Sequence, residues 1–271
     1  MAPAKGRVSR ETRMQRSLWL PIIGVLIAVA ITSAMDAAGY TDFSALPLFP
    51  LMLIFWFVQR NPRREIGLKL AAPKHFGLAM LYPLIIFSVV AGLAFANHAL
   101  DLSHTNWIKA LLNVALLTGT TFLVAMITEE GFFRGWLWAS LARVGLKPAA
   151  LIFWTSVAFS LWHWSAITLD TGFNVPIDRV PLFMLNAAVL GGVWAIMRER
   201  SGSILVSSLS HGLWNGCDYL LFGFGTHRGA LGIADTAFYG PEVGLLGFGL
   251  NAAFLLLLLL FGRGRAPTLS Q

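Results

Sequence analysis

Eight apolar runs, most of them close to the length of a membrane span, dominate the 271 residues of this chain. A helix needs roughly 20 apolar residues to cross a hydrocarbon core about 30 Å thick. Only 12% of the residues are charged, against about 25% in a typical soluble domain, so polar surface is too scarce to coat a water-soluble globule. The sequence therefore predicts one domain over residues 1–271, an all-α polytopic membrane helix bundle of about eight transmembrane helices. The predicted spans are roughly 18–35, 43–58, 76–98, 108–128, 148–167, 180–197, 203–222 and 243–262.

Two of these spans have uncertain ends. The second contains Pro47 and Pro50, and proline inside a helix removes a hydrogen bond and kinks or breaks it. Apolar character in the fourth continues past two adjacent glutamates as far as Leu141. We therefore expect that helix to run to about Val144, which would leave 106–117 as a separate piece.

The positions of the basic residues predict the topology. Inner loops of membrane proteins are enriched in Lys and Arg, and an N-terminus inside the cell places 17 of the 20 Lys and Arg residues on the inner side. Those residues are Lys5, Arg7, Arg10, Arg13, Arg16, Arg60, Arg63, Arg64, Lys69, Lys74, Arg134, Arg143, Lys147, Arg198, Arg200, Arg263 and Arg265. Both termini are then cytoplasmic, and residues 1–17 form a basic cytoplasmic segment ahead of a retained first helix. The net charge of +7 reflects these loops, so we expect membrane lipid and no nucleic acid as partners.

Three charged residues close together inside the fourth apolar segment need a reason. A charge in the middle of a span costs about 2.5–3.5 kcal/mol on insertion scales. On an α-helix, Glu130 and Arg134 share a face one turn apart and can neutralise each other. Glu129 points about 100° away and is left without that partner, which suits a general base. The alternative is that Glu129 lies at the membrane surface and is simply solvated.

Two further pairs of polar or aromatic residues lie one helical turn apart in later spans. Phe159 and His163 form the first pair, and His211 and Asn215 form the second. Taken alone, each histidine could be a hydrogen-bonded core residue. At a rise of 1.5 Å per residue, Glu129 lies about 21 Å from the inner side, and the two histidines lie about 24 Å and roughly 15–20 Å from it. All three groups can therefore meet near the middle of the bilayer as one site.

The order and spacing of these residues resemble the CPBP family, which comprises the CAAX proteases and bacteriocin-processing enzymes also called Abi proteins. The family's EExxxR, FxxxH and HxxxN motifs correspond here to Glu129-Glu130-x-x-x-Arg134, Phe159-x-x-x-His163 and His211-x-x-x-Asn215. The motifs occupy about 129–215, inside an expected catalytic core of about 106–222. The ordered triple is specific, whereas each motif alone is weak.

The resemblance implies an intramembrane hydrolase that cleaves a membrane-associated peptide or protein tail, in a bacterial inner membrane by analogy. It implies that Glu129 activates the attacking water and that Glu130 and Arg134 order the site. His163, His211 and Asn215 would position water or stabilise the oxyanion. No cofactor is expected in this glutamic-type mechanism. Zinc held by Glu129, His163 and His211 is the alternative, although the sequence contains no HExxH motif.

Two non-proteolytic functions compete with this interpretation. A membrane immunity or scaffold protein could retain the pocket without activity, but every motif position here holds a chemically competent residue. A transporter could use the buried charges as a relay, but the chain shows no internal repeat of the kind that many transporters have.

Overall fold

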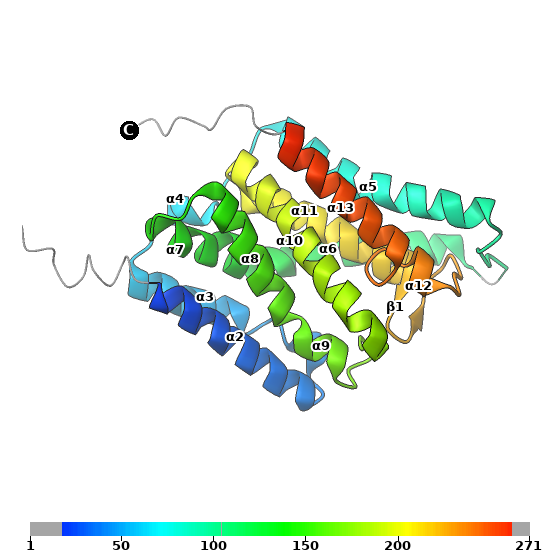
Figure 1. Cartoon of the computed structure of the whole chain (residues 1–271), viewed down its shortest axis with the longest axis horizontal. Helices are drawn as coiled ribbons and strands as arrows, with labels where there is room; N and C mark the ends of the chain where they lie inside the picture. The colour runs from blue at the N-terminus through cyan, green and yellow to red at the C-terminus, as the bar shows by residue number, and fades with distance from the viewer. Residues whose placement is uncertain (1–17, 104, 262–271) are drawn as a thin grey trace, which may run out of the picture.

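Helices form 75% of the chain that the structure describes, which is residues 18–103 and 105–261 of a computed structural model (Figure 1). The predicted basic segment 1–17, His104, Arg263 and Arg265 lie outside the described residues. The long helices are α2 (Trp19–Ala37), α3 (Leu48–Gln59), α5 (Pro73–Ala96), α6 (Trp107–Ile127), α8 (Pro148–Trp162), α10 (Val180–Ser201), α11 (Ile204–Cys217) and α13 (Leu245–Phe261). Each of the eight predicted spans overlaps one of them, with ends that differ by a few residues.

Short elements connect or extend these helices. The α-helical ones are α4 (Arg63–Ile66), α7 (Trp138–Arg143), α9 (Trp164–Thr168) and α12 (Thr236–Tyr239). Two are 3-10 turns, η1 (Thr41–Phe43) and η3 (Ile177–Arg179), and two are π-helices, η2 (Glu130–Leu137) and η4 (Asp218–Phe222). Strands β1 (Gly223–Phe224) and β2 (His227–Arg228) pair antiparallel in a small hairpin.

The predicted all-α membrane bundle is confirmed. Five helical stretches in the described chain are long and apolar enough to cross a membrane, and α8 and α13 are shorter apolar helices. The five stretches are Trp19–Ala37, Thr41–Gln59, Pro73–Ala96, Trp107–Arg143 and Ile177–Ser201. The second predicted span is interrupted as expected, because Pro47 is the N-cap of α3. The fourth extends to Arg143, as expected, but α6 is unbroken from Trp107 to Ile127, so the prediction of a separate piece at 106–117 is wrong.

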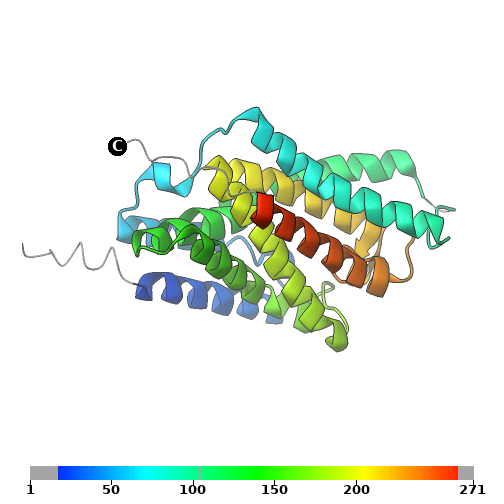
Figure 2. The same ribbon diagram turned by 45° about the horizontal axis from the view of Figure 1, so that its top comes forward.

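Helices α10 and α11 occupy the middle of the bundle. Figures 1 and 2 both place them between α2 on one side and α5 on the other. Helix α11 packs against α6 and α5, while α10 packs against α8 and α13. Glycines let α11 approach α6 closely: a Cβ at Gly212 would lie 2.7 Å from the Thr118 carbonyl oxygen, and one at Gly216 would lie 2.2 Å from the Thr118 hydroxyl oxygen. Small residues four apart are a common means of close packing between membrane helices.

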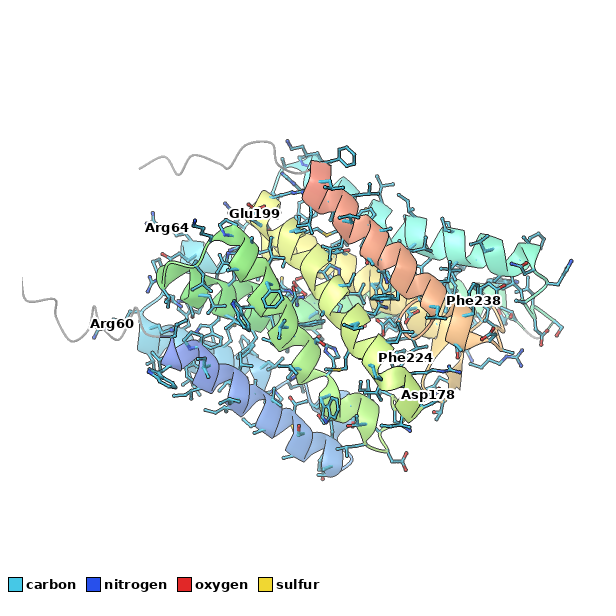
Figure 3. All side chains as sticks on the ribbon, in the orientation of Figure 1. Arg60, Arg64, Asp178, Glu199, Phe224 and Phe238 are labelled. Atoms are coloured by element: carbon cyan, nitrogen blue, oxygen red, sulfur yellow. The ribbon has the colours of Figure 1, made fainter. Side chains whose placement is uncertain are left out.

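The two ends of the bundle differ in character. Figure 3 shows Arg60, Arg64 and Glu199 near the end that carries α4, and Asp178 and Phe224 near the end that carries α9. We call these the α4 end and the α9 end. The α4 end contains basic residues that were predicted to lie inside, and the hairpin β1–β2 lies toward the α9 end (Figure 1).

Buried hydrogen bonds fix the loop at the α4 end to the π-helix η2. The Arg198 guanidinium donates to the backbone carbonyls of Arg134, at 3.1 Å, and Glu65, at 2.8 Å. Arg143 donates to the Glu65 carboxylate at 2.7 Å. A buried carbonyl needs a partner, and Arg198 supplies one for a carbonyl of η2.

Candidate active site

A cavity of about 380 Å³ lies among the helices, in the half of the bundle toward the α9 end. Four of the six predicted site residues line it, and they come from three separate segments: Glu129, His163, His211 and Asn215. The structure thus brings the three motifs together, as the shared depth predicted. Glu130 and Arg134 are completely buried and do not line the cavity. They lie behind the lining residues, and Glu130 contacts one of these, His211.

The π-helix η2 presents the two glutamates. Thr128, with φ −102° and ψ −93°, ends α6, and Glu129 stands at the N-cap of η2. Glycine permits this wide backbone path, because a Cβ at Gly131 would lie only 2.9 Å from the Met126 carbonyl oxygen. Sequence reasoning assumed an ordinary α-helix here. Short π-helical segments occur frequently at functional sites.

The predicted pairing of Glu130 with Arg134 is present. An Arg134 nitrogen lies 3.1 Å from Glu130 Oε1, and neither side chain is accessible to solvent. The other terminal nitrogen donates to the Gly191 carbonyl at 3.2 Å. The guanidinium carbon lies 4.2 Å from the centre of the Phe159 ring, a cation–π distance. Phe159 of the second motif therefore supports the ion pair as well as the neighbouring histidine.

His211 stands between the two glutamates. Its Nδ1 lies 3.2 Å from Glu130 Oε1, and its Nε2 lies 3.8 Å from Glu129 Oε2. The ring is stacked on Trp194 with centroids 4.1 Å apart. The sequence had suggested that Glu129 has no partner. In the structure, His211 of α11 is its neighbour across the cavity. A carboxylate paired with arginine only accepts hydrogen bonds, so Nδ1–H donates to Glu130, and a neutral His211 presents the lone pair of Nε2 toward Glu129.

His163 is held in a single tautomer when neutral. Its Nδ1 lies 2.8 Å from the Phe159 carbonyl oxygen, which can only accept. Nδ1 therefore carries the hydrogen, and Nε2 is a hydrogen-bond acceptor. Of the two roles predicted for His163, only the positioning of water fits a neutral ring, because Nε2 has no hydrogen to donate to an oxyanion. Asn215 is the neutral donor among the four lining residues.

Sequence reasoning missed several other polar residues of the cavity. Tyr219, Asn186 and Glu242 also line it. Asn186 had a usable signal, because it is a lone amide inside an apolar run. Glu242 had a weaker signal, since it stands directly before the last apolar run.

Glu242 lies in the non-helical segment 240–244, between α12 and α13. Trp214 Nε1 donates to its Oε1 at 2.6 Å. Burial raises the pKa of the Glu242 carboxyl to about 7, against the opposing effect of the Trp214 hydrogen bond. Besides Glu129 and the exposed Asp42, the cavity thus has a third carboxyl group, supplied by a different part of the chain.

The fit of a metal can be tested on the side chains present. Among the residues that the structure describes, no three His, Cys, Asp or Glu side chains are grouped so that they could hold a metal ion. Glu129, His163 and His211 share the cavity, but they do not form a zinc ligand set in this arrangement.

Comparison with known proteins supports the resemblance drawn from the motifs. Residues 110–217, less than half of the chain, match the family model "Type II CAAX prenyl endopeptidase Rce1-like". No curated protein and no solved structure matches the chain. The matched segment contains all three motifs and the helices that carry them. Over residues 110–217, the chain is therefore similar to the Rce1-like family of type II CAAX prenyl endopeptidases.

Proposed function

We propose that this membrane protein hydrolyses a peptide bond in the tail of a membrane-associated protein, with Glu129 as the general base that activates water. The family supports the coarser part of this statement, an intramembrane endopeptidase of the CAAX type. The observation that carries the finer part is the convergence of Glu129, His163, His211 and Asn215 on one cavity.

The geometry supports a division of labour among these residues. The acceptor nitrogen of His163 or of His211 holds one hydrogen of a water molecule, the water gives its other proton to Glu129, and the water oxygen attacks the peptide carbonyl. The Asn215 amide then donates to the oxyanion, an interaction that contributes most when the donor is already in place. Glu130 and Arg134 act indirectly, because they orient His211 and the backbone of η2 without lining the cavity.

The cavity's position also bears on how substrate enters. Its more exposed lining residues include Asp42 of η1 and Thr120 of α6, so a tail can enter between these two elements. Thr32, near the C-terminal end of α2, and Asn186, near the N-terminal end of α10, line it too. Those helix ends belong to the α9 end, which the positive-inside rule places outside. We therefore propose entry from the outer half of the membrane.

Reconstitution in liposomes tests the function. Wild type should cut a tail peptide once, whereas Glu129→Ala, His163→Ala and His211→Ala should lose activity while remaining folded. Glu199→Gln is the control, because Glu199 lies near the α4 end, away from the cavity (Figure 3). Prenylated and unprenylated tails are compared in parallel. If all three cavity variants fold and cut at the wild-type rate, the proposed site is wrong.

Chelation separates the metal-free proposal from the zinc alternative. The glutamic mechanism predicts full activity after treatment with a chelator, with no stoichiometric zinc found by metal analysis. Loss of activity that added zinc restores would contradict it.

A further inference from the structure

The segment that carries Glu242 is held in place by a chain of buried polar side chains from three helices. Asn186 Nδ2 donates to the backbone carbonyls of Pro241 and Glu242, each at 2.9 Å. Asn251 Nδ2 donates to Asn186 Oδ1 at 3.1 Å, and the Tyr82 hydroxyl donates to Asn251 Oδ1 at 2.8 Å. Tyr82, Asn186 and Asn251 are each at most 1% exposed.

Such a chain is costly unless every member is hydrogen-bonded, because burying an unpaired amide or hydroxyl costs about 1–3 kcal/mol. Here it satisfies the carbonyls of a non-helical segment, which need partners when buried. The result is that α5, α10 and α13 together fix the backbone of Glu242 beside the cavity.

The side chain of Glu242 is fixed as well. Trp214 Nε1 holds one carboxyl oxygen, and Trp214 is itself fully buried and stacked on Tyr82 with ring centroids 5.6 Å apart. Glu242 lines the cavity, and the residue is only 8% exposed. One carboxyl oxygen is thus anchored in a residue that borders the space where substrate would lie.

Burial is the main cause of the raised pKa of Glu242; the charge of His211 opposes it and that of Glu129 adds to it. The titratable residues that interact electrostatically with Glu242 are Glu129 beside η2, His211 of α11, Asp218 and Tyr219 of η4, and Tyr82 of α5. Two of these five are carboxylic acids. Among the described residues, no Lys or Arg forms an ion pair with Glu242. A carboxyl group in these surroundings can carry a proton at neutral pH and release it to a base.

We propose that Glu242 is a further catalytic residue, the acid that protonates the amine nitrogen as the peptide bond breaks. This inference rests on the proposed function. Glu129 takes one proton from water, and the hydroxide oxygen forms the new bond to the carbonyl carbon. The C–N bond then breaks, and the Glu242 carboxyl gives its proton to the departing nitrogen and becomes a carboxylate. Transfer of a proton from Glu129 to Glu242 through cavity water resets the pair, so one water molecule is consumed in each turnover.

The competing mechanism has Glu129 carry the same proton from water to nitrogen by itself. The two differ in what an ester substrate requires. An alkoxide is a better leaving group than an amide anion, so ester cleavage depends much less on an acid. A tail peptide and its depsipeptide, with an ester at the same bond, therefore distinguish the two mechanisms.

The test compares wild type, Glu242→Gln and the control Glu199→Gln on both substrates in liposomes. Glutamine keeps an oxygen acceptor for Trp214 Nε1 but has no acidic proton. We expect Glu242→Gln to lower kcat for the amide by about 100-fold, the usual effect of a lost general acid, with kcat for the ester unchanged. Equal losses on both substrates, or no loss on either, would overturn the proposal.

Wild type provides a second readout if Glu242→Gln does not fold. Its amide kcat should fall as the pH rises above 7, whereas its ester kcat should lack this basic limb. Identical profiles for the two substrates contradict the role of Glu242. Failure of wild type to cut either substrate would instead refute the proposed peptidase function, so the two failures are distinguishable.

Discussion

Breaking the buried ion pair between Glu130 and Arg134 should destabilise the protein strongly. Arg134→Met keeps much of the side-chain volume but removes the charge. Both partners are fully buried and 3.1 Å apart, so the variant leaves the Glu130 carboxylate buried with no cationic partner and only His211 and Ser207 as polar neighbours. Leaving one charge of a buried pair uncompensated costs about 3–5 kcal/mol. Loss of the cation–π contact with Phe159, at 4.2 Å, can add up to about 2 kcal/mol.

A double-mutant cycle separates the charge effect from lost packing. Glu130→Gln alone leaves the Arg134 guanidinium unpaired, whereas the double variant removes both charges and keeps an oxygen acceptor for His211. We expect the double variant to be clearly more stable than Arg134→Met. The coupling energy should be at least about 2 kcal/mol, well above the deviation of about 0.3–0.5 kcal/mol found for residues that do not interact.

The assay is reversible unfolding of the four proteins in mixed detergent micelles, followed by tryptophan fluorescence. Asp178→Asn provides a surface control, since Asp178 is exposed. A coupling energy near zero, or an Arg134→Met variant within about 1 kcal/mol of wild type, would refute the inference that charge pairing stabilises this core.

Three other predictions concern packing, topology and pH. Gly212→Ala should destabilise the protein by about 1–3 kcal/mol through overpacking, because the new Cβ would lie 2.7 Å from the α6 backbone. The control Gly119→Ala should be neutral in the same unfolding assay, because a Cβ at Gly119 would have nothing within 4 Å. An Asp42→Cys variant should react with an impermeant thiol reagent in intact cells, and Arg64→Cys only after permeabilisation; the reverse pattern would invert the topology. Burial raises the pKa of Glu242 to about 7, so the proton needed for amide cleavage is present below that pH and lost above it. The amide kcat should therefore fall from pH 7 to 9, and a rise over this range would count against the acid role.

Much of the fold follows from local sequence patterns. Apolar runs predicted the eight long helices, and Pro47 predicted the break before α3. Pairs such as His211 and Asn215 shared a helix face, so the spacing alone indicated which segments contribute to the cavity.

The remaining features depend on contacts between segments far apart in the chain. The π-helical form of η2 depends on wider i,i+5 hydrogen bonding, which the residue types around Glu130 do not distinguish from an α-helix. The contact of His211 with both glutamates depends on how closely α11 approaches α6. Glu242 belongs to the cavity only because Asn186 and Asn251 hold a loop that has no periodic pattern of its own.

The central claim is that Glu129 activates the hydrolytic water in this cavity. Its most direct test is the single-turnover rate of Glu129→Gln on a membrane-anchored tail that binds wild type and variant equally. Loss of a general base should lower this rate by about 100-fold or more, with tail affinity and thermal stability unchanged. A variant that binds the tail and cleaves it at the wild-type rate would contradict the account.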